Sequence, residues 1–383
     1  MEFRDLNKQY LENRQKIDAA IQNVLLSAQY IGGSPVNELE KKLADYVGVK
    51  HCITCANGTD ALQLALMAWG IGKGDAVFVP DFTFFSTAEV VPCVGATPVF
   101  VDIEEDTFNI SVSSLEKAIL KVKEEGKLEP KAIIAVDLFG QPADYPLIKA
   151  IADKYDLFLL EDGAQGFGGQ IGDQKACSFG DISTTSFFPA KPLGCYGDGG
   201  AIFTDNDEWN ELIRSYKVHG KGQDKYDNVR IGMNSRLDTI QAAILLAKLD
   251  KFIEFEIEAM NRIADKYTNQ LKDILITPFV KAGYISSWAQ YTIQLSDIKE
   301  REYLQKELKM RSIPSMVYYA KPLHKQSAFS HMGYCDDEFK HSNILCDTVL
   351  SLPMHPYLTD LEVDEICKQC KELLFQYKNS VIV

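Results

Sequence analysis

The sequence predicts an α/β protein, with a mostly parallel central sheet in a large N-terminal domain and a smaller α+β domain at the C-terminus. Short apolar segments alternate with amphipathic helical segments up to about residue 250, which is the pattern of parallel strands joined by helical crossovers. This alternation then becomes less regular, and 383 residues exceed the usual size of one hydrophobic core. We therefore expect a large domain at 1–251 and a small one at 252–383.

The elements of the large domain follow from local pattern. Helical periodicity covers residues 8–29 and a second segment that begins at Ser34, with a turn between them. Strands are expected in the short apolar runs 51–55, 76–79, 97–101, 132–136, 158–160, 182–186 and 201–203. Ligands of open parallel sheets bind at the carboxyl ends of the strands, so functional side chains are expected there.

The C-terminal region has fewer and less regular elements. A helix from about 238 to 271 is expected to link the two domains. The periodicity after it predicts a strand at 290–295, a helix at 299–310, a strand at 315–319 and a closing helix at 360–377.

Composition excludes several classes of function. The formal net charge of −14 disfavours nonspecific binding to nucleic acid or to an anionic membrane. No apolar run has membrane-spanning length, and residues 1–10 lack the apolar core of a signal peptide. We therefore expect a cytoplasmic protein without nucleic-acid or membrane partners.

The nine cysteines do not form a disulfide or metal-binding pattern. Two C-x-x-C pairs occur, Cys52 with Cys55 in a predicted strand and Cys367 with Cys370 in a predicted helix. Nothing local organises the four thiols into one zinc site, so we interpret them as small core side chains and expect no metal.

Two residues are candidates for cofactor chemistry. Asp162 follows an apolar run at the end of a predicted buried strand, and Lys191 lies between prolines and aromatics before a glycine-rich loop. An enzyme that uses pyridoxal phosphate (PLP) needs a lysine to bind the cofactor's aldehyde and a carboxylate to keep its ring nitrogen protonated. Taken alone, Asp162 could instead cap a turn and Lys191 could be a solvated loop residue.

A third motif suits a phosphate. Gly58 and Thr59 follow the first predicted strand and open a helix, where backbone amides and the positive end of the helix dipole favour an anion. Ser186 would add a second hydroxyl. The alternative for Thr59 is that its hydroxyl only caps the helix.

The chain resembles the DegT/StrS family of nucleotide-sugar aminotransferases along nearly its entire length. The resemblance rests on residues 57–62 (NGTDAL), 161–165 (EDGAQ), 186–194 (SFFPAKPLG), 197–200 (GDGG), 234–238 (NSRLD) and 352–357 (LPMHPY). It implies a fold-type I PLP-dependent aminotransferase that acts as a homodimer with shared active sites. Glutamate would be the amino donor and a nucleotide-linked keto sugar the acceptor.

The resemblance also implies roles for individual residues. Lys191 is expected to be the Schiff-base lysine and proton shuttle, and Asp162 the partner of the ring nitrogen. The other implied cofactor contacts are Gly58, Thr59 and Ser186 at the phosphate, Gln165 at the ring hydroxyl, Phe82 on the ring face, and Asn234 reaching the phosphate from the neighbouring subunit. The expected substrate contacts are Arg236, Tyr318, Tyr319 and His324.

The chain is most similar to the subgroup that aminates the 3-keto form of a UDP-linked N-acetyl-hexuronic acid for surface polysaccharides such as O-antigen or capsule. Two positions depart from its pattern. Residues 318–320 read Tyr-Tyr-Ala where His-Tyr-Pro is expected, and Gly163 replaces a residue that is more often alanine. We expect the glycine to enlarge the space beside Asp162.

Other functions remain as alternatives. The acceptor could be another UDP- or dTDP-linked 3-keto or 4-keto sugar. A PLP-dependent sugar dehydratase is disfavoured because this family's dehydratases have histidine in place of Lys191. A non-catalytic nucleotide-sugar binding protein would not need Lys191 and Asp162, and an NAD-dependent enzyme would need a G-x-G-x-x-G motif after the first strand, which is absent.

Overall fold

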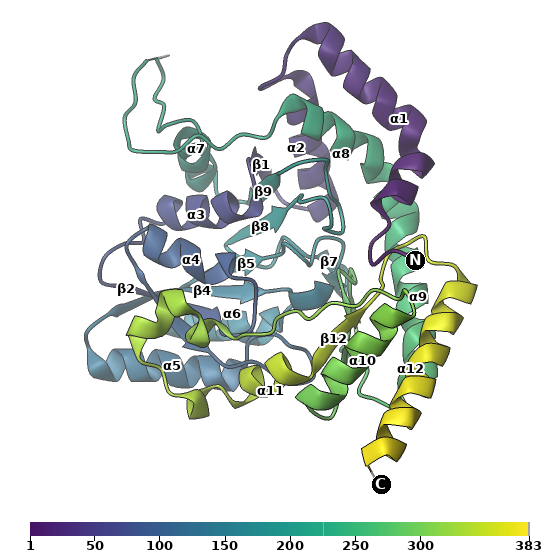
Figure 1. The fold of residues 1–383 in the computed structure, drawn as a ribbon. Coiled ribbons are helices and arrows are strands. Elements are labelled where there is room, and N and C mark those ends of the chain that lie inside the picture. The colour runs from purple at the N-terminus through teal and green to yellow at the C-terminus, as the bar shows by residue number, and fades with distance from the viewer. Residues whose placement is uncertain (225, 382–383) are drawn as a thin grey trace.

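Helices cover both faces of a seven-stranded sheet in the computed structural model, which describes residues 1–224 and 226–381 (Figure 1). The strand order is β1-β9-β8-β5-β4-β2-β3. The strands from β8 to β3 run parallel, whereas β9 runs antiparallel between β8 and β1. The seven strands are β1 (His51–Cys55), β2 (Asp75–Pro80), β3 (Thr97–Val101), β4 (Glu129–Val136), β5 (Phe158–Asp162), β8 (Ile182–Ser186) and β9 (Gly200–Thr204).

Side chains alternate between the two faces of this sheet, as the twofold repeat of a strand requires. On β2, Val77 and Val79 pack in a core with α3 and α4, whereas Ala76 and Phe78 pack in the opposite core with α5 and α6. The helices of the large domain are α1 (Leu6–Ser27), α2 (Ser34–Val47), α3 (Gly58–Ala68), α4 (Ser86–Cys93), α5 (Val112–Glu125), α6 (Tyr145–Tyr155), α7 (Asp207–Tyr216) and α8 (Thr239–Lys251).

A separate apolar core lies in the C-terminal region. It is built by α9 (Ile257–Leu271), α10 (Ile298–Met310), α12 (Asp360–Val381) and the two-stranded sheet of β11 (Tyr291–Gln294) and β12 (Val349–Leu352). We infer that this core is the smaller domain. The described residues also form the short helix α11 (Lys340–Thr348) and a small sheet of β6 (Gln170–Ile171), β7 (Gln174–Lys175) and β10 (Tyr284–Ile285).

The link between the two cores is not one uniform helix as predicted. A π-helical turn, Phe252–Glu256, separates α8 from α9. The prediction of a strand at 315–319 is wrong, because only Met316 pairs, in an isolated bridge with Ser351. The chain then leaves the sheet, and Tyr318 and Tyr319 turn to a cavity wall instead.

The two cysteine pairs lie in different cores. Cys52 and Cys55 point to opposite faces of β1, whereas Cys367 and Cys370 are buried in the C-terminal core. Within residues 1–224 and 226–381, no helix combines the length and the hydrophobicity that a bilayer crossing requires.

Candidate active site

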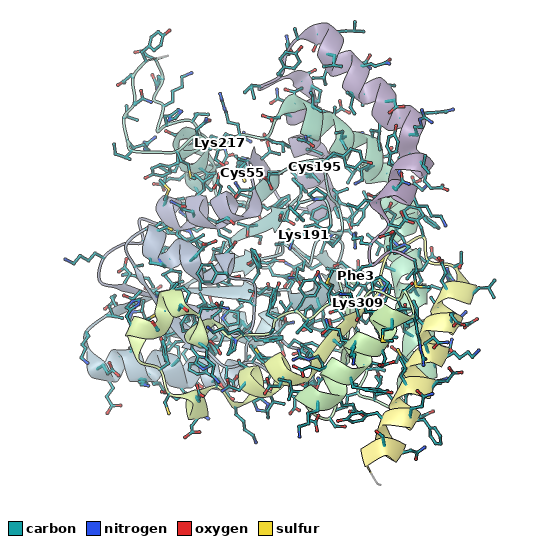
Figure 2. All side chains as sticks on the ribbon, in the orientation of Figure 1. Phe3, Cys55, Lys191, Cys195, Lys217 and Lys309 are labelled. Atoms are coloured by element: carbon teal, nitrogen blue, oxygen red, sulfur yellow. The ribbon has the colours of Figure 1, made fainter. Side chains whose placement is uncertain are left out.

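A cavity of about 660 Å³ opens at the carboxyl edge of the sheet. The predicted parallel strands bring together the ends of β5 and β8 and the loop that follows β1. Figure 2 shows Lys191 near the middle of the molecule. The cavity is lined by Asn57, Gly58, Thr59, Asp60, Leu62, Thr83, Phe84, Ser86, Val136, Asp162, Ala164, Gln165, Ser186, Phe188, Ala190, Lys191, Asp198, Gln290, Tyr318 and Tyr319.

Asp162 ends β5 with its carboxylate in this cavity, as predicted. The Thr87 hydroxyl donates to Oδ2 at 2.9 Å and the Ala164 backbone N–H donates to Oδ1 at 3.2 Å. Burial raises the pKa of Asp162, and these two bonds and the charge of Lys191 only partly oppose that effect. The ionised form of a carboxyl group that is buried in this way is stabilised by a nearby cation, such as a protonated pyridine nitrogen.

Lys191 lines the same cavity and has an amine suited to nucleophilic attack. Burial lowers its pKa to about 8, while the charge of Asp162 acts to raise it and that of Arg4 acts to lower it. A larger fraction of the amine is therefore neutral near pH 7 than in a solvated lysine. Its backbone N–H donates to Phe188 O at 2.8 Å, which fixes the tight turn around the lysine.

Hydroxyl groups and a helix start form one end of the cavity. The start of α3 faces Ser186 so closely that a Cβ on Gly58 would lie 2.8 Å from the serine Cβ. The helix cap is the side chain of Asn57, which accepts from Asp60 N at 2.8 Å. Thr59 is therefore not needed as a cap, and its hydroxyl lies 2.8 Å from the Ser86 hydroxyl. These groups suit a phosphate.

The walls between these two ends are amide and aromatic. Gln165 accepts from Phe139 N at 2.7 Å and donates to the Tyr319 hydroxyl at 3.1 Å. The structure does not bring Phe82 to the cavity, because this ring is 1% exposed and packs edge-on against Phe139 and Tyr319. Phe84, which is 53% exposed, lines the cavity instead, and Phe188 lines it from the loop before Lys191.

These groups fit PLP. The cavity offers an amine for the aldehyde, a buried carboxylate for the ring nitrogen, hydroxyls at a helix start for the phosphate and an aromatic wall for the ring. Within the described parts of the chain, no three side chains of the histidine, cysteine or carboxylate type are grouped to hold a metal ion.

Comparison with known proteins agrees with this chemistry. The model of the DegT/DnrJ/EryC1/StrS aminotransferase family matches residues 12–371. The UDP-2-acetamido-2-deoxy-3-oxo-D-glucuronate aminotransferase of Pseudomonas aeruginosa is 47% identical over 370 residues, which cover 96% of this chain and 98% of that protein. The chain belongs to the DegT/DnrJ/EryC1/StrS aminotransferase family.

Solved structures show the same relationship. A DegT DnrJ EryC1 StrS aminotransferase from Brucella abortus has a TM-score of 0.95 and 51% identity, covering 97% of this chain and 99% of its own. NtdA from Bacillus subtilis, solved with bound cofactor PMP, has a TM-score of 0.88 and 27% identity, covering 98% of this chain and 85% of its own. The protein is thus a PLP-dependent aminotransferase with the fold-type I architecture.

Two of the residues expected from the family do not meet Lys191 within one chain. Asn234 and Arg236 are exposed and line a second cavity of about 450 Å³. Asp198 lines both this cavity and the one that contains Lys191. The second cavity is therefore adjacent to the first, but Asn234 and Arg236 do not line the cavity that contains Lys191.

Of the predicted substrate residues Tyr318, Tyr319 and His324, only the two tyrosines line the cavity. Their position is the one expected for such contacts. His324 does not reach it, because the histidine is 6% exposed and its Nδ1 lies 2.6 Å from Asp81 Oδ2. Its Nε2 lies 3.2 Å from Asp336 Oδ1, and its ring stacks on Phe339. The structure assigns His324 to packing, which corrects the expectation of a substrate contact.

Gly163 does not enlarge the space beside Asp162, which corrects another expectation. A Cβ at this position would lie 2.7 Å from Cys177 Sγ and 3.1 Å from Thr184 O. The sulfur of Cys177 occupies the volume that an alanine methyl would need. The glycine therefore accommodates a larger neighbour and leaves no hole.

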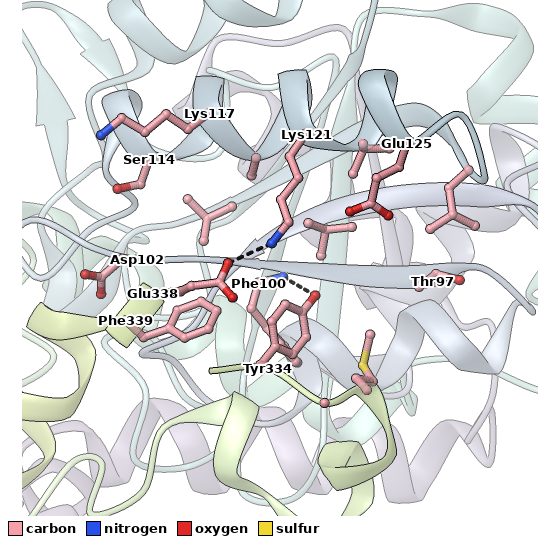
Figure 3. Close-up of a pocket in the computed structure, with 17 residues that line it drawn as sticks. Thr97, Phe100, Asp102, Ser114, Lys117, Lys121, Glu125, Tyr334, Glu338 and Phe339 are labelled. Carbon is pink, nitrogen blue, oxygen red and sulfur yellow. Dashed lines mark hydrogen bonds and ion pairs between the residues drawn. The ribbon is translucent and has the colours of Figure 1, made fainter. Parts of the chain in front are cut away.

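Another cavity, of about 540 Å³, lies against the edge strand β3 and shares no lining residue with the cavity of Lys191 (Figure 3). Its walls come from α5 and from residues 332–339. Lys121 and Glu338 form an ion pair at 2.8 Å across it, and the Tyr334 hydroxyl accepts from Phe100 N at 3.2 Å. These contacts tie the two walls together, and we assign this cavity no chemistry.

Several residues at the site were not among those predicted, and three of them bear on the chemistry. Phe84 and Thr87 belong to the segment after β2 that starts α4, and Arg4 belongs to the N-terminal segment. The polar run at 86–87 at a strand-to-helix junction is a pattern that could have indicated Thr87. Nothing local in the sequence marks Arg4, because its contact lies 187 residues away.

Proposed function

We propose that the protein transfers the amino group of glutamate to the 3-keto group of a UDP-linked N-acetyl-hexuronic acid. The observation that supports amino transfer is the shared cavity of Lys191 and Asp162 beside a phosphate-binding helix start. The sugar follows from the similarity to the Pseudomonas enzyme. The product would supply a surface polysaccharide such as O-antigen or capsule, and the reaction would take place in the cytoplasm.

Each residue of the site has a task in this reaction. PLP, when bound, takes up the amino group and withdraws electrons from the carbon that loses or gains a proton. The Lys191 amine anchors the cofactor and, once released by a substrate, moves that proton through its Nζ. Asp162 holds the ring nitrogen protonated, and Gln165 contacts the ring hydroxyl.

The remaining residues of the site would bind and orient the cofactor and the two substrates. Gly58, Thr59 and Ser186 hold the phosphate, while Phe84 replaces Phe82 as our candidate for the ring face. We propose that Asn234 reaches the phosphate from the neighbouring subunit of a homodimer. Arg236 would bind a carboxylate of glutamate or of the sugar, since its forked donors match that group. Tyr318 and Tyr319 would contact the sugar.

A pair of acceptors that differ at one carbon tests the sugar. The protein, loaded with PLP, is given glutamate and either the 3-keto UDP-N-acetyl-hexuronic acid or the same sugar with a hydroxymethyl group in place of the carboxylate. Formation of 2-oxoglutarate is measured. We expect the uronic acid to be preferred at least about tenfold in kcat/KM, because an unpaired arginine is costly. Equal rates would contradict the assignment, and Lys191→Ala gives the background.

A second candidate is amino transfer to another UDP- or dTDP-linked 3-keto or 4-keto sugar. The specific observation in its favour is Tyr318 and Ala320 in the cavity segment, where the uronic acid subgroup is expected to have histidine and proline. The same assay with dTDP-linked keto sugars separates the two candidates, because only one acceptor class should consume glutamate.

A further inference from the structure

The N-terminal segment before α1 is bound to the loop that contains the catalytic lysine. Arg4 Nη2 donates to Lys191 O at 2.9 Å and to Pro192 O at 3.4 Å. The neighbouring Phe3 is held from the other side, because its carbonyl accepts from Met354 N at 3.0 Å. Figure 2 labels Phe3 and Lys191, which lie far apart in the sequence.

The guanidinium of Arg4 is confined. Its Nη1 is buried, and no hydrogen-bond partner for it lies among the residues that the structure describes. The charge of Arg4 interacts with those of Glu256, Tyr357 and Tyr318 on one side of the balance and with Lys191, Lys248 and His355 on the other. An arginine remains protonated in proteins, so a positive charge is fixed beside the lysine loop.

The environment of the Lys191 amine contains charges of both signs. Burial lowers its pKa most, Asp162 acts in the opposite direction, and Arg4 lowers it further. The other ionisable groups in the cavity wall are Asp60, Asp198, Tyr318 and Tyr319. Arg4 therefore offsets part of the carboxylate's effect on the amine.

We propose that Arg4 is a positioning residue for Lys191: its guanidinium holds the main chain of the lysine turn and places a permanent positive charge at the carbonyl of Lys191. This inference rests on the proposed role of Lys191 as the residue that binds PLP. Without the charge of Arg4, the effect of Asp162 on the pKa of Lys191 would be less opposed, and a larger fraction of Lys191 would be protonated. The protonated amine cannot attack the cofactor's aldehyde.

The test follows cofactor capture by the cofactor-free protein, so it does not depend on turnover. PLP is mixed with the wild type, with the uncharged variants Arg4→Gln and Arg4→Met, and with Arg4→Lys. The rate of covalent attachment is followed by absorbance over a range of pH and confirmed by borohydride trapping and mass spectrometry. Lys8→Gln is the matched control, because Lys8, in the first turn of α1, also donates to the C-terminal region, to Tyr357 O at 3.3 Å, without contacting the lysine turn.

We expect the pH midpoint of capture to move upward by roughly half a unit in both uncharged variants, a loss of about threefold in neutral amine near pH 7. Arg4→Lys should keep the midpoint of the wild type, and so should Lys8→Gln. A merely structural role would lower the amount of folded protein, measured by circular dichroism, without moving the midpoint.

Three results would overturn the inference: unchanged midpoints in both uncharged variants, an equal shift in Lys8→Gln, or a shift in Arg4→Lys as large as that in Arg4→Gln. Failure of the wild type itself to capture PLP would be a different outcome. That result would contradict the role of Lys191 in the proposed function and not only the role of Arg4.

Discussion

Burial disfavours the charged form of both Asp162 and Lys191. For the lysine, this supplies a neutral amine that can attack an aldehyde. For the aspartate, it makes the carboxylate dependent on a cationic partner, which a protonated ring nitrogen provides. The same low-polarity cavity thus prepares two side chains for complementary tasks.

Asp162→Asn tests this dependence on charge. An amide cannot stabilise a pyridinium as a carboxylate does, and a charge-assisted hydrogen bond contributes ~1.5–3 kcal/mol. We expect kcat to fall about 10- to 100-fold, with the far-UV circular dichroism unchanged because Thr87 and Ala164 keep a partner. An unaltered kcat in a stopped-flow assay of amino transfer would contradict the assignment.

Phe84 and Phe82 provide a matched pair of substitutions. Phe84→Ala should weaken PLP binding by ~0.5–1.5 kcal/mol, the value of an aromatic stacking contact, with little loss of stability. Phe82→Ala should instead lower the free energy of unfolding by ~3–5 kcal/mol, because it leaves a cavity in the core. Titration with PLP measures the affinity and chemical denaturation measures the stability of both variants. Weaker PLP binding in Phe82→Ala and lower stability in Phe84→Ala would show that Phe82, and not Phe84, contacts the ring.

The sequence could predict that Asp162 and Lys191 share a site, but not which phenylalanine forms its wall. Asp162 and Lys191 were predictable because a strand end and a proline-bounded loop locate them in the chain. Phe82 and Phe84 lie two residues apart in the same segment, so their sequence neighbours do not distinguish them. Which ring is buried depends on the path of the backbone between β2 and α4.

At the scale of elements, regular segments were predictable where one pattern governed them. The bounds of β1, β3 and β8 match the predictions residue for residue, because short runs of β-branched and apolar side chains lie in a buried sheet. The run at 315–319 has the same composition, but it has no continuous partner strand. A strand forms only where another is available to pair, and this information is not local.

The end of β2 and the segment at 318–324 are joined by one acidic residue. Asp81 accepts from the backbone N–H of His324 at 2.7 Å, and its own carbonyl accepts from Leu323 N at 2.8 Å. With the imidazole contact, these bonds fix the segment that carries Tyr318 and Tyr319 to the cavity. His324 is therefore important for the shape of the site without contacting its ligands.

This contact predicts a dependence of stability on pH. Burial acts to lower the pKa of His324, but the hydrogen bond and charge of Asp81 outweigh it, so the pKa is raised above 6.5. A group whose pKa is higher in the folded than in the unfolded protein stabilises the fold fully at pH values below its unfolded-state pKa. This stabilisation is lost as the pH rises through the folded-state pKa. The stability advantage of the wild type over His324→Gln should therefore shrink as the pH increases from 6.5.

Denaturant unfolding of both proteins at several pH values measures this difference. We expect His324→Gln to cost ~1–3 kcal/mol slightly below pH 6.5. There His324 is protonated and Asp81, whose pKa burial raises, has not yet taken up a proton. Asp336→Asn is the control, because that partner's side chain is 64% exposed and surface pairs contribute only ~0–1 kcal/mol. A difference that stays constant or grows with pH would show that His324 does not titrate as proposed.

For the whole molecule, the separate cavities of Lys191 and Asn234 predict that activity requires two subunits. We expect Lys191→Ala and Asn234→Asp to be inactive alone, the second because it places a negative charge toward the phosphate. In mixed dimers, one site receives both substitutions and the other receives none.

Statistical mixing of the two inactive variants should therefore restore about a quarter of the wild-type activity. The two proteins are unfolded together, refolded and assayed, with each variant refolded alone as the control. No recovery in a sample that contains dimers would place Asn234 in the site of its own chain or outside the site.

The π-helical turn between α8 and α9 has a consequence for chain length. Turns of this kind arise when one additional residue is accommodated in an α-helix. Deleting one residue within Phe252–Glu256 should let the helix close into regular α geometry, while the residues before and after it keep the faces they present now. The chain could thus become one residue shorter at this point without a change in how the C-terminal core packs.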